Sequence, residues 1–264
     1  QIVPLPAFKD NYIWLMHDGR HAVVVDPGDA APVRDFIALH DLTLAAVLIT
    51  HHHADHVRGL AGLSPACPVY GPAREDIAGI THPVQAPDLV SIPEFALTLQ
   101  VLDVPGHTRG HIAYYAPGVL FCGDTLFSAG CGRLFEGTPT QLFDSLNTLA
   151  ALPDDTQVYC THEYTLANLA FAQAAEPENP ARDRWLDECV ARRNAGKPTL
   201  PREEMRMKLR AAIEAAKDSG ILVMARTDCR PTLGIDEAVA RIEMYVKEGA
   251  DILFLDSPAD EDEV

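Results

Sequence analysis

Residues 50–56 read Thr50-His51-His52-His53-Ala54-Asp55-His56, directly after an apolar run that begins at Leu44. Such a run is typical of a buried strand, and a loop at a strand end presents its side chains in a fixed fan. The spacing lets His51 and His53 converge on one metal ion while Asp55 and His56 turn to a second. Imidazole and carboxylate bind divalent transition metals, and the lack of cysteine here disfavours a closed structural zinc site. A solvated surface cluster of histidines is the alternative, which the order of these residues disfavours.

Three later segments each place one further candidate ligand just after an apolar run. They are Pro105-Gly106-His107-Thr108, Phe121-Cys122-Gly123-Asp124-Thr125 and Cys160-Thr161-His162-Glu163-Tyr164. Together they supply the partners that the first segment lacks. The whole set is enough for two metal ions bridged by one carboxylate: His51, His53, Asp55, His56, His107, Asp124 and His162. We expect structural or surface roles for the histidines without such a context: His17, His21, His40, His82 and His111.

Short apolar runs alternate with helical patterns along the chain, which predicts an α/β fold built of layers. Strands are predicted at residues 12–16, 22–25, 44–50, 95–104, 112–115, 119–122 and 158–161. Helices are predicted at residues 31–40 and 140–152, and again from residue 166. Beyond residue 201 the pattern predicts a helix, a strand, a helix and a strand, at 202–218, 221–227, 236–248 and 251–256, and then an acidic stretch at 260–263.

The composition narrows the class of partner. Hydrophobic residues make up 47% of the 264 residues and charged ones 22%, as in ordinary soluble globular proteins. No apolar run reaches membrane-spanning length, no signal-like segment opens the chain, and the six cysteines are scattered. We therefore expect a cytoplasmic monomer with reduced thiols and no membrane partner. The net charge of −17 argues against nucleic acid, and an anionic substrate would need local positive charge at its site.

The candidate ligands, in this order, resemble the metal-binding set of the metallo-β-lactamase superfamily, whose fold is an αβ/βα sandwich. Within that superfamily, four segments resemble glyoxalase II, the hydroxyacylglutathione hydrolase family. They are Lys9-Asp10-Asn11-Tyr12, Val25-Asp26-Pro27-Gly28, Cys131-Gly132-Arg133-Leu134-Phe135-Glu136-Gly137 and Thr161-His162-Glu163-Tyr164-Thr165-Leu166-Ala167-Asn168. The resemblance runs from residue 1 to about residue 200.

The resemblance implies a site with two divalent metal ions, with zinc expected ahead of iron or manganese. The first ion would be held by His51, His53 and His107. The second would be held by Asp55, His56 and His162, and Asp124 would bridge the two.

The same resemblance implies a pocket for the glutathione part of a substrate. Arg133 would meet its charge, while Tyr164 and Asn168 would hydrogen-bond its backbone groups. Phe135 stands where many members of the family have a tyrosine, so a hydroxyl contact to the substrate would be missing.

The implied activity is hydrolysis of S-(2-hydroxyacyl)glutathione, above all S-lactoylglutathione, to glutathione and a 2-hydroxy acid. A water that bridges two divalent cations loses a proton near neutral pH, and the resulting hydroxide attacks the thioester carbonyl. Asp55 and Asp124 are the expected catalytic residues, and Asp55 would both ligate a metal and orient the hydroxide. The thiolate leaves readily, because a free thiol has a pKa of about 8.5.

Other functions stay open from the sequence. A persulfide dioxygenase with one iron has the same fold, but it generally departs from the Gly-Arg-Leu-Phe-Glu-Gly pattern of residues 132–137. A lactamase or lactonase fits the motifs around Arg133 and Tyr164 less well. A metal-binding chimera with impaired substrate binding is a third alternative, because the C-terminal part departs from glyoxalase II.

From about residue 201 the resemblance changes. Residues 221–228 and 249–256 resemble the isocitrate lyase and phosphoenolpyruvate mutase superfamily, as a strand–helix–strand piece of a (β/α)₈ barrel. The Mg²⁺-binding acids and the catalytic cysteine loop of that superfamily are absent, so we expect no lyase activity from this part. The predicted domains are a catalytic domain at residues 1–165, the start of a helical glutathione-binding region at 166–201, and a barrel fragment with an acidic tail at 202–264.

Overall fold

The computed structural model describes residues 1–63, 65–196, 202–217, 222–227, 229 and 234–255. Its contacts divide the chain into two compact units, residues 1–179 and 180–264. The three predicted domains, with limits at residues 165 and 201, stay a prediction. No helix within the described residues is long and apolar enough to cross a bilayer.

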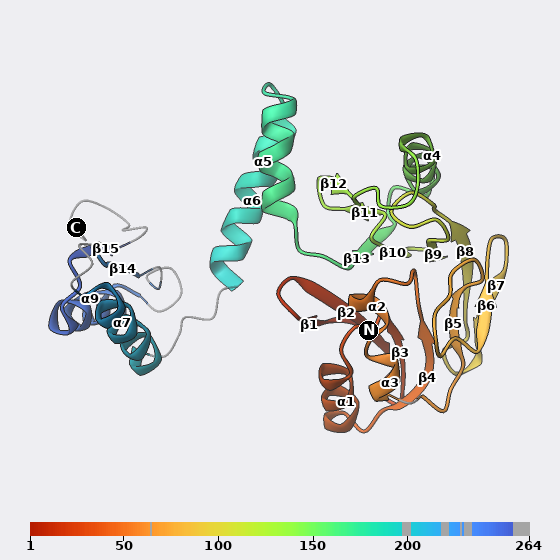
Figure 1. The fold of residues 1–264 in the computed structure, drawn as a ribbon, viewed down its shortest axis with the longest axis horizontal. Coiled ribbons are helices and arrows are strands. Elements are labelled where there is room, and N and C mark those ends of the chain that lie inside the picture. Colours follow the sequence, from red (N-terminus) through yellow and green to blue (C-terminus); the bar gives the residue numbers. More distant parts are fainter. Residues whose placement is uncertain (64, 197–201, 218–221, 228, 230–233, 256–264) are drawn as a thin grey trace. The chain divides into compact units, whose positions relative to one another are not determined.

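The first unit contains a six-stranded sheet in the order β1-β2-β3-β4-β5-β6 (Figure 1). The first three strands are antiparallel neighbours, and β3 to β6 run parallel. The strands are β1 Ile2–Ala7, β2 Asn11–His17, β3 His21–Val25, β4 Thr43–Leu48, β5 Val69–Pro72 and β6 His82–Val84. The central strands β3 and β4 are rich in buried valine, alanine and leucine, as expected for parallel strands that are covered on both faces.

A second sheet has five strands in the order β13-β10-β9-β8-β7. Its strands are β7 Leu89–Ile92, β8 Leu97–Asp103, β9 Ile112–Ala116, β10 Val119–Gly123 and β13 Gln157–Cys160. β7 to β10 are antiparallel neighbours, and β13 is parallel to β10. A 3₁₀ turn, η1 Pro93–Phe95, precedes β8, and a small hairpin follows β10, formed by β11 Leu126–Phe127 and β12 Gly130–Cys131.

One apolar core lies between the two sheets. Val25 and Leu48 of the first sheet pack there with Val101, Tyr114 and Phe121 of the second. Helices α1 (Ala30–Leu39) and α3 (Leu60–Leu63) cover the outer face of the first sheet, and α4 (Pro139–Ala150) covers that of the second. The layers run helix, sheet, sheet, helix, so the predicted αβ/βα sandwich is confirmed.

The second unit contains a parallel pair of strands and its helices. The elements are α6 Pro180–Gly196, α7 Arg202–Ala216, β14 Met224–Thr227, α9 Ile235–Glu248 and β15 Ile252–Leu255. β14 and β15 pair in parallel, and α7 and α9 pack with β14 through Leu209, Ala225 and Tyr245. α9 ends where Gly249 adopts a left-handed conformation with φ of 91°. The predicted order of elements is confirmed, while residues 218, 221, 256 and 260–263 lie outside the described residues.

Candidate metal centre

The predicted ligands lie where strands of both sheets end. β10 is parallel to β13, and β8 runs in the same direction because β9 is antiparallel to both β8 and β10. The carboxyl ends of these three strands therefore lie at one edge of their sheet, and the edge where β4 ends faces it. The segments with the ligands follow at once: residues 49–56 after β4, 104–111 after β8, 124 after β10 and 161–162 after β13.

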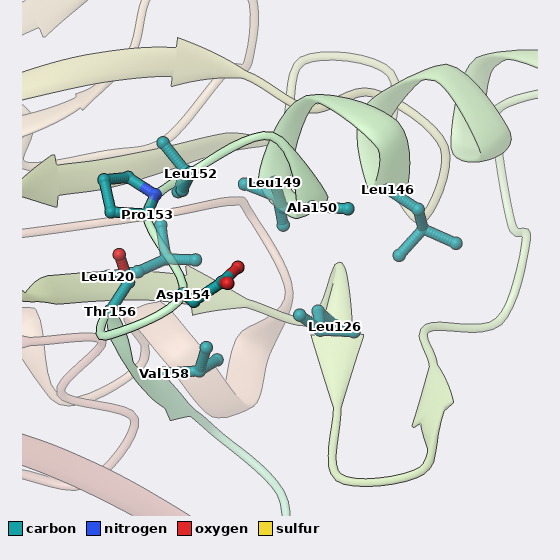
Figure 2. A pocket seen from close by; sticks show the side chains of 10 residues that line it. All are labelled: Leu120, Leu126, Leu146, Leu149, Ala150, Leu152, Pro153, Asp154, Thr156 and Val158. Carbon is teal, nitrogen blue, oxygen red and sulfur yellow. The ribbon is translucent and has the colours of Figure 1, made fainter.

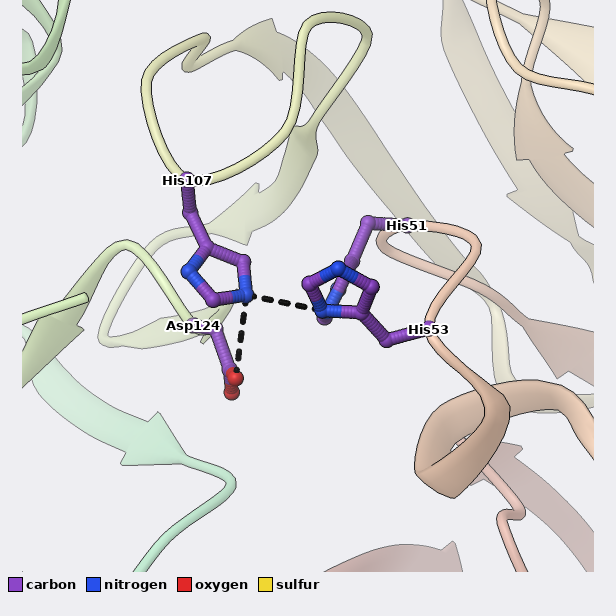
Figure 3. Close-up of side chains that lie close together, drawn as sticks. All are labelled: His51, His53, His107 and Asp124. Carbon is purple, nitrogen blue, oxygen red and sulfur yellow. Dashed lines mark hydrogen bonds and ion pairs between the residues drawn. The ribbon is translucent and has the colours of Figure 1, made fainter. Parts of the chain in front are cut away.

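His51, His53, His107 and Asp124 form the first cluster (Figure 3), in which one possible ligand atom of each lies within 4.8 Å of the others. Nδ1 of His53 lies 3.1 Å from Nε2 of His51 and 2.9 Å from Nε2 of His107. Nε2 of His107 also lies 3.4 Å from Oδ2 of Asp124. Donor atoms from three separate segments thus converge on one small space.

Asp55, His56 and His162 form the second cluster. Asp55 and His56 are on the short helix α2 (Ala54–Val57), and Oδ2 of Asp55 lies 3.4 Å from Nε2 of His162. Asp124 faces this cluster as well, with Oδ1 at 3.4 Å from Nε2 of His56 and Oδ2 at 3.3 Å from Nε2 of His162. The structure therefore brings all seven predicted ligands together, with Asp124 between the two groups.

Asp26 supports the second cluster through hydrogen bonds to His56 and to the backbone of Thr50. Its buried carboxylate accepts a hydrogen bond from Nδ1 of His56 at 3.0 Å and another from the backbone N–H of Thr50 at 2.8 Å. One side chain therefore fixes both the His56 ring and the start of the ligand segment. Contacts of this kind set the tautomer and orientation of metal-binding histidines.

Asp10, in the loop before β2, and Asn11, the first residue of β2, support the same cluster. Nδ1 of His162 donates to Oδ1 of Asp10 at 3.0 Å, and Nδ2 of Asn11 donates to Oδ2 of Asp55 at 2.9 Å. The segment Lys9-Asp10-Asn11-Tyr12, which the sequence showed only as a family resemblance, thus has a structural role at the site.

The loop around Gly132 supports His107. The backbone carbonyl of Arg133 accepts a hydrogen bond from Nδ1 of His107 at 2.8 Å. A Cβ atom on Gly132 would lie 1.8 Å from the carbonyl oxygen of Asp124. Only glycine lets this loop approach so closely, which explains the glycine in the motif.

Burial and nearby charges divide the imidazoles into two groups. Burial lowers the pKa of His51, His53 and His107, so these rings are neutral at pH 7 and have lone pairs available. Burial also opposes charge on His162, but hydrogen bonds to Asp124 and Asp55 outweigh it and raise its pKa to about 10. The hydrogen bond with His162 in turn lowers the pKa of Asp55, which is therefore an ionised carboxylate.

This donor set fits divalent transition metals. Nε2 of His56 and Oδ1 of Asp124 are buried and face each other at 3.4 Å, but neither has a well-formed hydrogen bond among the described residues. Buried polar atoms rarely stay without a partner, so such a pair points to a ligand that completes it. Three imidazoles in the first cluster, and two imidazoles with the Asp55 carboxylate in the second, match a pair of divalent ions bridged by Asp124.

The residues predicted to meet the substrate lie around the clusters. The Phe135 ring lies 5.3 Å from the His53 ring and 5.2 Å from the His107 ring, and the exposed Arg133 guanidinium lies 5.2 Å from the Phe135 ring centre. The Tyr164 ring stacks on His162 at 4.8 Å. Asn168, on α5 (Thr165–Ala175), donates from Nδ2 to the carbonyl of Ser128 at 3.1 Å, and so holds α5 to the small hairpin.

An open cleft of about 570 Å³ lies beside the first cluster. Charged and aromatic side chains line it: His52, Arg74, Glu75, Asp76, Arg109, Phe135 and Glu136. Another hollow, of about 420 Å³, lies between α4 and strands β10 and β13, and its lining is largely leucine (Figure 2). Phe135, which contacts the rings of His53 and His107, lines the cleft, whereas no predicted ligand or substrate residue lines the apolar pocket. The cleft is therefore the candidate substrate site.

His111 lies closer to the site than we expected from the sequence. It is buried, its ring stacks on that of His51 at 4.6 Å, and its Nε2 accepts a hydrogen bond from the backbone N–H of Asp124 at 3.2 Å. Burial lowers its pKa to about 3, which keeps that nitrogen free to accept. Its position four residues after His107 was the only signal in the sequence.

Comparison with known proteins agrees with this geometry. Residues 8–88 and 68–162 match the family model of the metallo-beta-lactamase superfamily. ETHE1 from Myxococcus xanthus is 34% identical, with a TM-score of 0.55 over 62% of this chain and 76% of that one. TTHA1623, solved in a di-iron-bound form, is 30% identical, with a TM-score of 0.52 over 61% of this chain and 92% of that one. The fold and the matching family model define a member of the metallo-β-lactamase superfamily.

A narrower match follows. Residues 163–207 match the family model of the hydroxyacylglutathione hydrolase C-terminus. The hydroxyacylglutathione hydrolase of Cupriavidus taiwanensis is 54% identical over 215 residues, which cover 76% of this chain and 81% of that protein. The chain belongs to the hydroxyacylglutathione hydrolase family. Residues 186–264 also match the family model of phosphoenolpyruvate phosphomutase, so the predicted resemblance of the C-terminal part is confirmed.

Proposed function

We propose that this chain hydrolyses the thioester of S-(2-hydroxyacyl)glutathione, above all S-lactoylglutathione, to glutathione and a 2-hydroxy acid. The observation that carries the proposal is the position of Asp124 between the two clusters. Its carboxylate lies 3.4 Å from Nε2 of His107 in the first cluster, and 3.4 and 3.3 Å from Nε2 of His56 and His162 in the second. A bridging carboxylate between two donor sets is the arrangement that a two-metal hydrolase needs. The identity of 54% to a hydroxyacylglutathione hydrolase supports the choice of substrate.

The proposed ligands of one ion are His51, His53 and His107, and those of the other are Asp55, His56 and His162, with Asp124 shared. We propose zinc as the metal, with iron or manganese as substitutes, because imidazole and carboxylate donors accept all three. Two such ions supply a water of lowered pKa as the nucleophile and positive charge for the oxyanion.

The chain's own residues would position this chemistry. Asn11 donates to Oδ2 of Asp55 at 2.9 Å, and the same oxygen lies 3.4 Å from Nε2 of His162, so Asn11 holds the Asp55 carboxylate at the second cluster. We assign Asp55 and Asp124 the catalytic roles, as ionised carboxylates that keep the attacking water in place. No separate general acid is required, because a thiol of pKa about 8.5 leaves as thiolate at neutral pH.

The substrate would lie in the cleft beside Phe135. There the exposed guanidinium of Arg133 provides the positive charge that an anionic glutathione conjugate needs on a chain with a net charge of −17. Tyr164 and Asn168 are proposed to hydrogen-bond the glutathione backbone. We further propose that the protein works as a cytoplasmic monomer on such small thioesters, with neither nucleic acid nor membrane as a partner.

The test is an assay of purified protein with S-lactoylglutathione, with release of glutathione followed by a thiol reagent. Oxygen uptake with glutathione persulfide runs in parallel as the readout for a persulfide dioxygenase. We expect thioester hydrolysis without oxygen uptake. Oxygen consumption without hydrolysis would contradict the proposal and establish the alternative.

The C-terminal part of the chain bears on how tightly the substrate binds. The match to hydroxyacylglutathione hydrolases covers 76% of the chain, and residues 186–264 match a different family. Part of the glutathione pocket is then altered, so we propose a raised KM with kcat less affected, since uniform binding is what would be lost. A KM equal to that of the Cupriavidus taiwanensis enzyme, measured side by side, would contradict this refinement.

A further inference from the structure

Glu75 lies in the turn after β5, next to the first cluster, and no motif in the sequence pointed to it. Its side chain is only 3% exposed. A buried carboxylate is costly unless hydrogen bonds and nearby charge stabilise it, so the contacts of Glu75 indicate what it does.

Those contacts join two of the segments that carry the ligands. Oε2 of Glu75 lies 2.9 Å from Nδ1 of His52, which stands between His51 and His53. Oε1 accepts from the hydroxyl of Thr108 and from the backbone N–H of Gly110, the latter at 3.1 Å. One carboxylate therefore binds the segment with His51 and His53 on one side and the segment with His107 on the other.

Gly110 shows how close this approach is. A Cβ atom there would lie 2.6 Å from Cγ of Glu75 and 3.1 Å from the backbone of Arg74. The segment after His107 thus comes near enough to Glu75 only because residue 110 has no side chain.

We propose that Glu75 is a positioning residue for the first metal, and that it acts through His52 on one segment and through Thr108 and Gly110 on the other. The inference rests on the proposed function, because it assumes that His51, His53 and His107 share one ion. Nδ1 of His53 and Nε2 of His107 lie 2.9 Å apart, and they belong to the two segments that Glu75 connects. Loss of this connection lets the two segments separate, and the ion loses ligands.

The structure offers a matched control on the same histidine. Oε1 of Glu136 lies 3.4 Å from Nε2 of His52, but the Glu136 side chain is 37% exposed. Exposed ion pairs contribute little because water screens them, whereas a buried contact holds its geometry. Glu136 also accepts from the backbone N–H of Arg109 at 3.0 Å, so it contacts the same two segments as Glu75 but from an exposed position. Glu136→Ala therefore removes the exposed contacts between the segments and leaves the buried ones of Glu75 in place. Glu94→Ala, at an exposed position on η1, is the control for loss of charge alone.

The experiment titrates metal-free protein with Co²⁺ and follows the visible absorption of the bound ion. We expect the wild type to bind two ions per chain. In Glu75→Ala the affinity for one of the two falls about tenfold or more, as is usual when a supporting partner of a ligand is lost, and the other ion binds nearly as before. Glu75→Gln retains an acceptor for Thr108 and Gly110 and should recover part of the affinity. Glu136→Ala and Glu94→Ala should match the wild type to within about threefold.

Thermal unfolding of each metal-free variant shows whether it is folded. If Glu75→Ala is not folded, His52→Ala replaces it as the test. The His52 ring is 33% exposed, and its removal leaves the contacts of Glu75 with Thr108 and Gly110 in place. We expect His52→Ala to weaken the binding of the same ion. Folded variants that bind both ions as the wild type does, or lose both equally, overturn the inference while the wild-type assay keeps the proposed function. A wild type that binds no Co²⁺ overturns both.

Discussion

Nδ1 of His162 donates to the carboxylate of Asp10 at 3.0 Å, although the two residues are 152 positions apart in the sequence. The other ring nitrogen of His162 faces Asp55 and Asp124 at 3.4 and 3.3 Å. Asp10 thus determines which nitrogen of His162 points into the second cluster. The first loop of the chain and its last core strand are joined at the site itself.

Asp10→Ala should weaken the metal held by His162. Loss of a carboxylate behind a metal-binding histidine typically costs 10- to 100-fold in metal affinity, so we expect roughly that loss for one of two ions. The measurement is zinc content after dialysis against a chelator of known affinity. Asp18→Ala is the control, because Asp18 makes a similar contact with His21 at 3.3 Å on the surface. Equal zinc contents in both variants would contradict this role.

Metal affinity should rise with pH. In the metal-free protein the carboxylates of Asp124 and Asp55 outweigh burial and raise the pKa of His162 to about 10, so its ring must lose a proton to bind metal at pH 7. The affinity for one ion should then increase by up to about tenfold per pH unit below that pKa. Zinc competition with a chelator at pH 6.5, 7.5 and 8.5 measures this. A flat profile would show that His162 is not a ligand.

The raised pKa of His162 also determines whether the metal-free protein becomes more or less stable as the pH rises. A histidine whose folded pKa exceeds its unfolded value of 6.5 stabilises the folded state below pH 6.5, and this contribution is lost as the pH rises toward 10. Metal-free protein should therefore become less resistant to urea between these limits, and His162→Gln should reduce that dependence.

Tyr114→Phe should destabilise the fold near the ligand segment. The Tyr114 hydroxyl is buried and donates to the carbonyl of Ile49 at 2.9 Å, so its loss leaves that carbonyl without its partner, at a cost of about 1–3 kcal/mol. Tyr159→Phe removes a hydroxyl that bonds Gln157 at the surface, and should change stability by less than about 0.5 kcal/mol. Urea unfolding of both variants in chelator tests the difference. Equal losses would contradict it.

Much of the fold and site could be predicted because the pattern is local. Each of the seven predicted ligands is at or just after the end of an apolar run, and these runs form β4, β8, β10 and β13. The strand predicted at residues 95–104 starts too early, because Pro93–Phe95 forms a 3₁₀ turn and β8 begins only at Leu97. His–x–His–x–Asp–His spacing within one loop specifies its geometry without help from distant residues.

The rest depends on contacts that leave no local pattern. Residues 2–7 carry Pro4 and Pro6 and are not among the predicted strands, yet they form β1 at the edge of the sheet, where proline is tolerated. Asn11 reaches Asp55 across 44 positions, and Glu75 reaches Gly110 across 35. Only the folded chain shows that these polar residues contact the predicted ligands and the segments that carry them.

Arg133→Met should separate substrate binding from metal binding. We expect KM for S-lactoylglutathione to rise by about five- to tenfold, the scale of one lost charge-assisted contact, with kcat and zinc content little changed. Arg20→Met, at an exposed position between β2 and β3, is the control for the loss of one positive charge. If both variants have the same KM as the wild type, Arg133 does not meet the substrate.

The central claim is that seven imidazole and carboxylate groups hold two ions that activate one water. The most direct test is the rate of S-lactoylglutathione hydrolysis by metal-free protein as zinc is added back. We expect a rate reduced by roughly a hundredfold or more without metal, and full recovery as two equivalents per chain are bound. The claim would be contradicted if the metal-free protein hydrolysed S-lactoylglutathione at the full rate. It would also be contradicted if the added zinc were bound without any recovery of the rate.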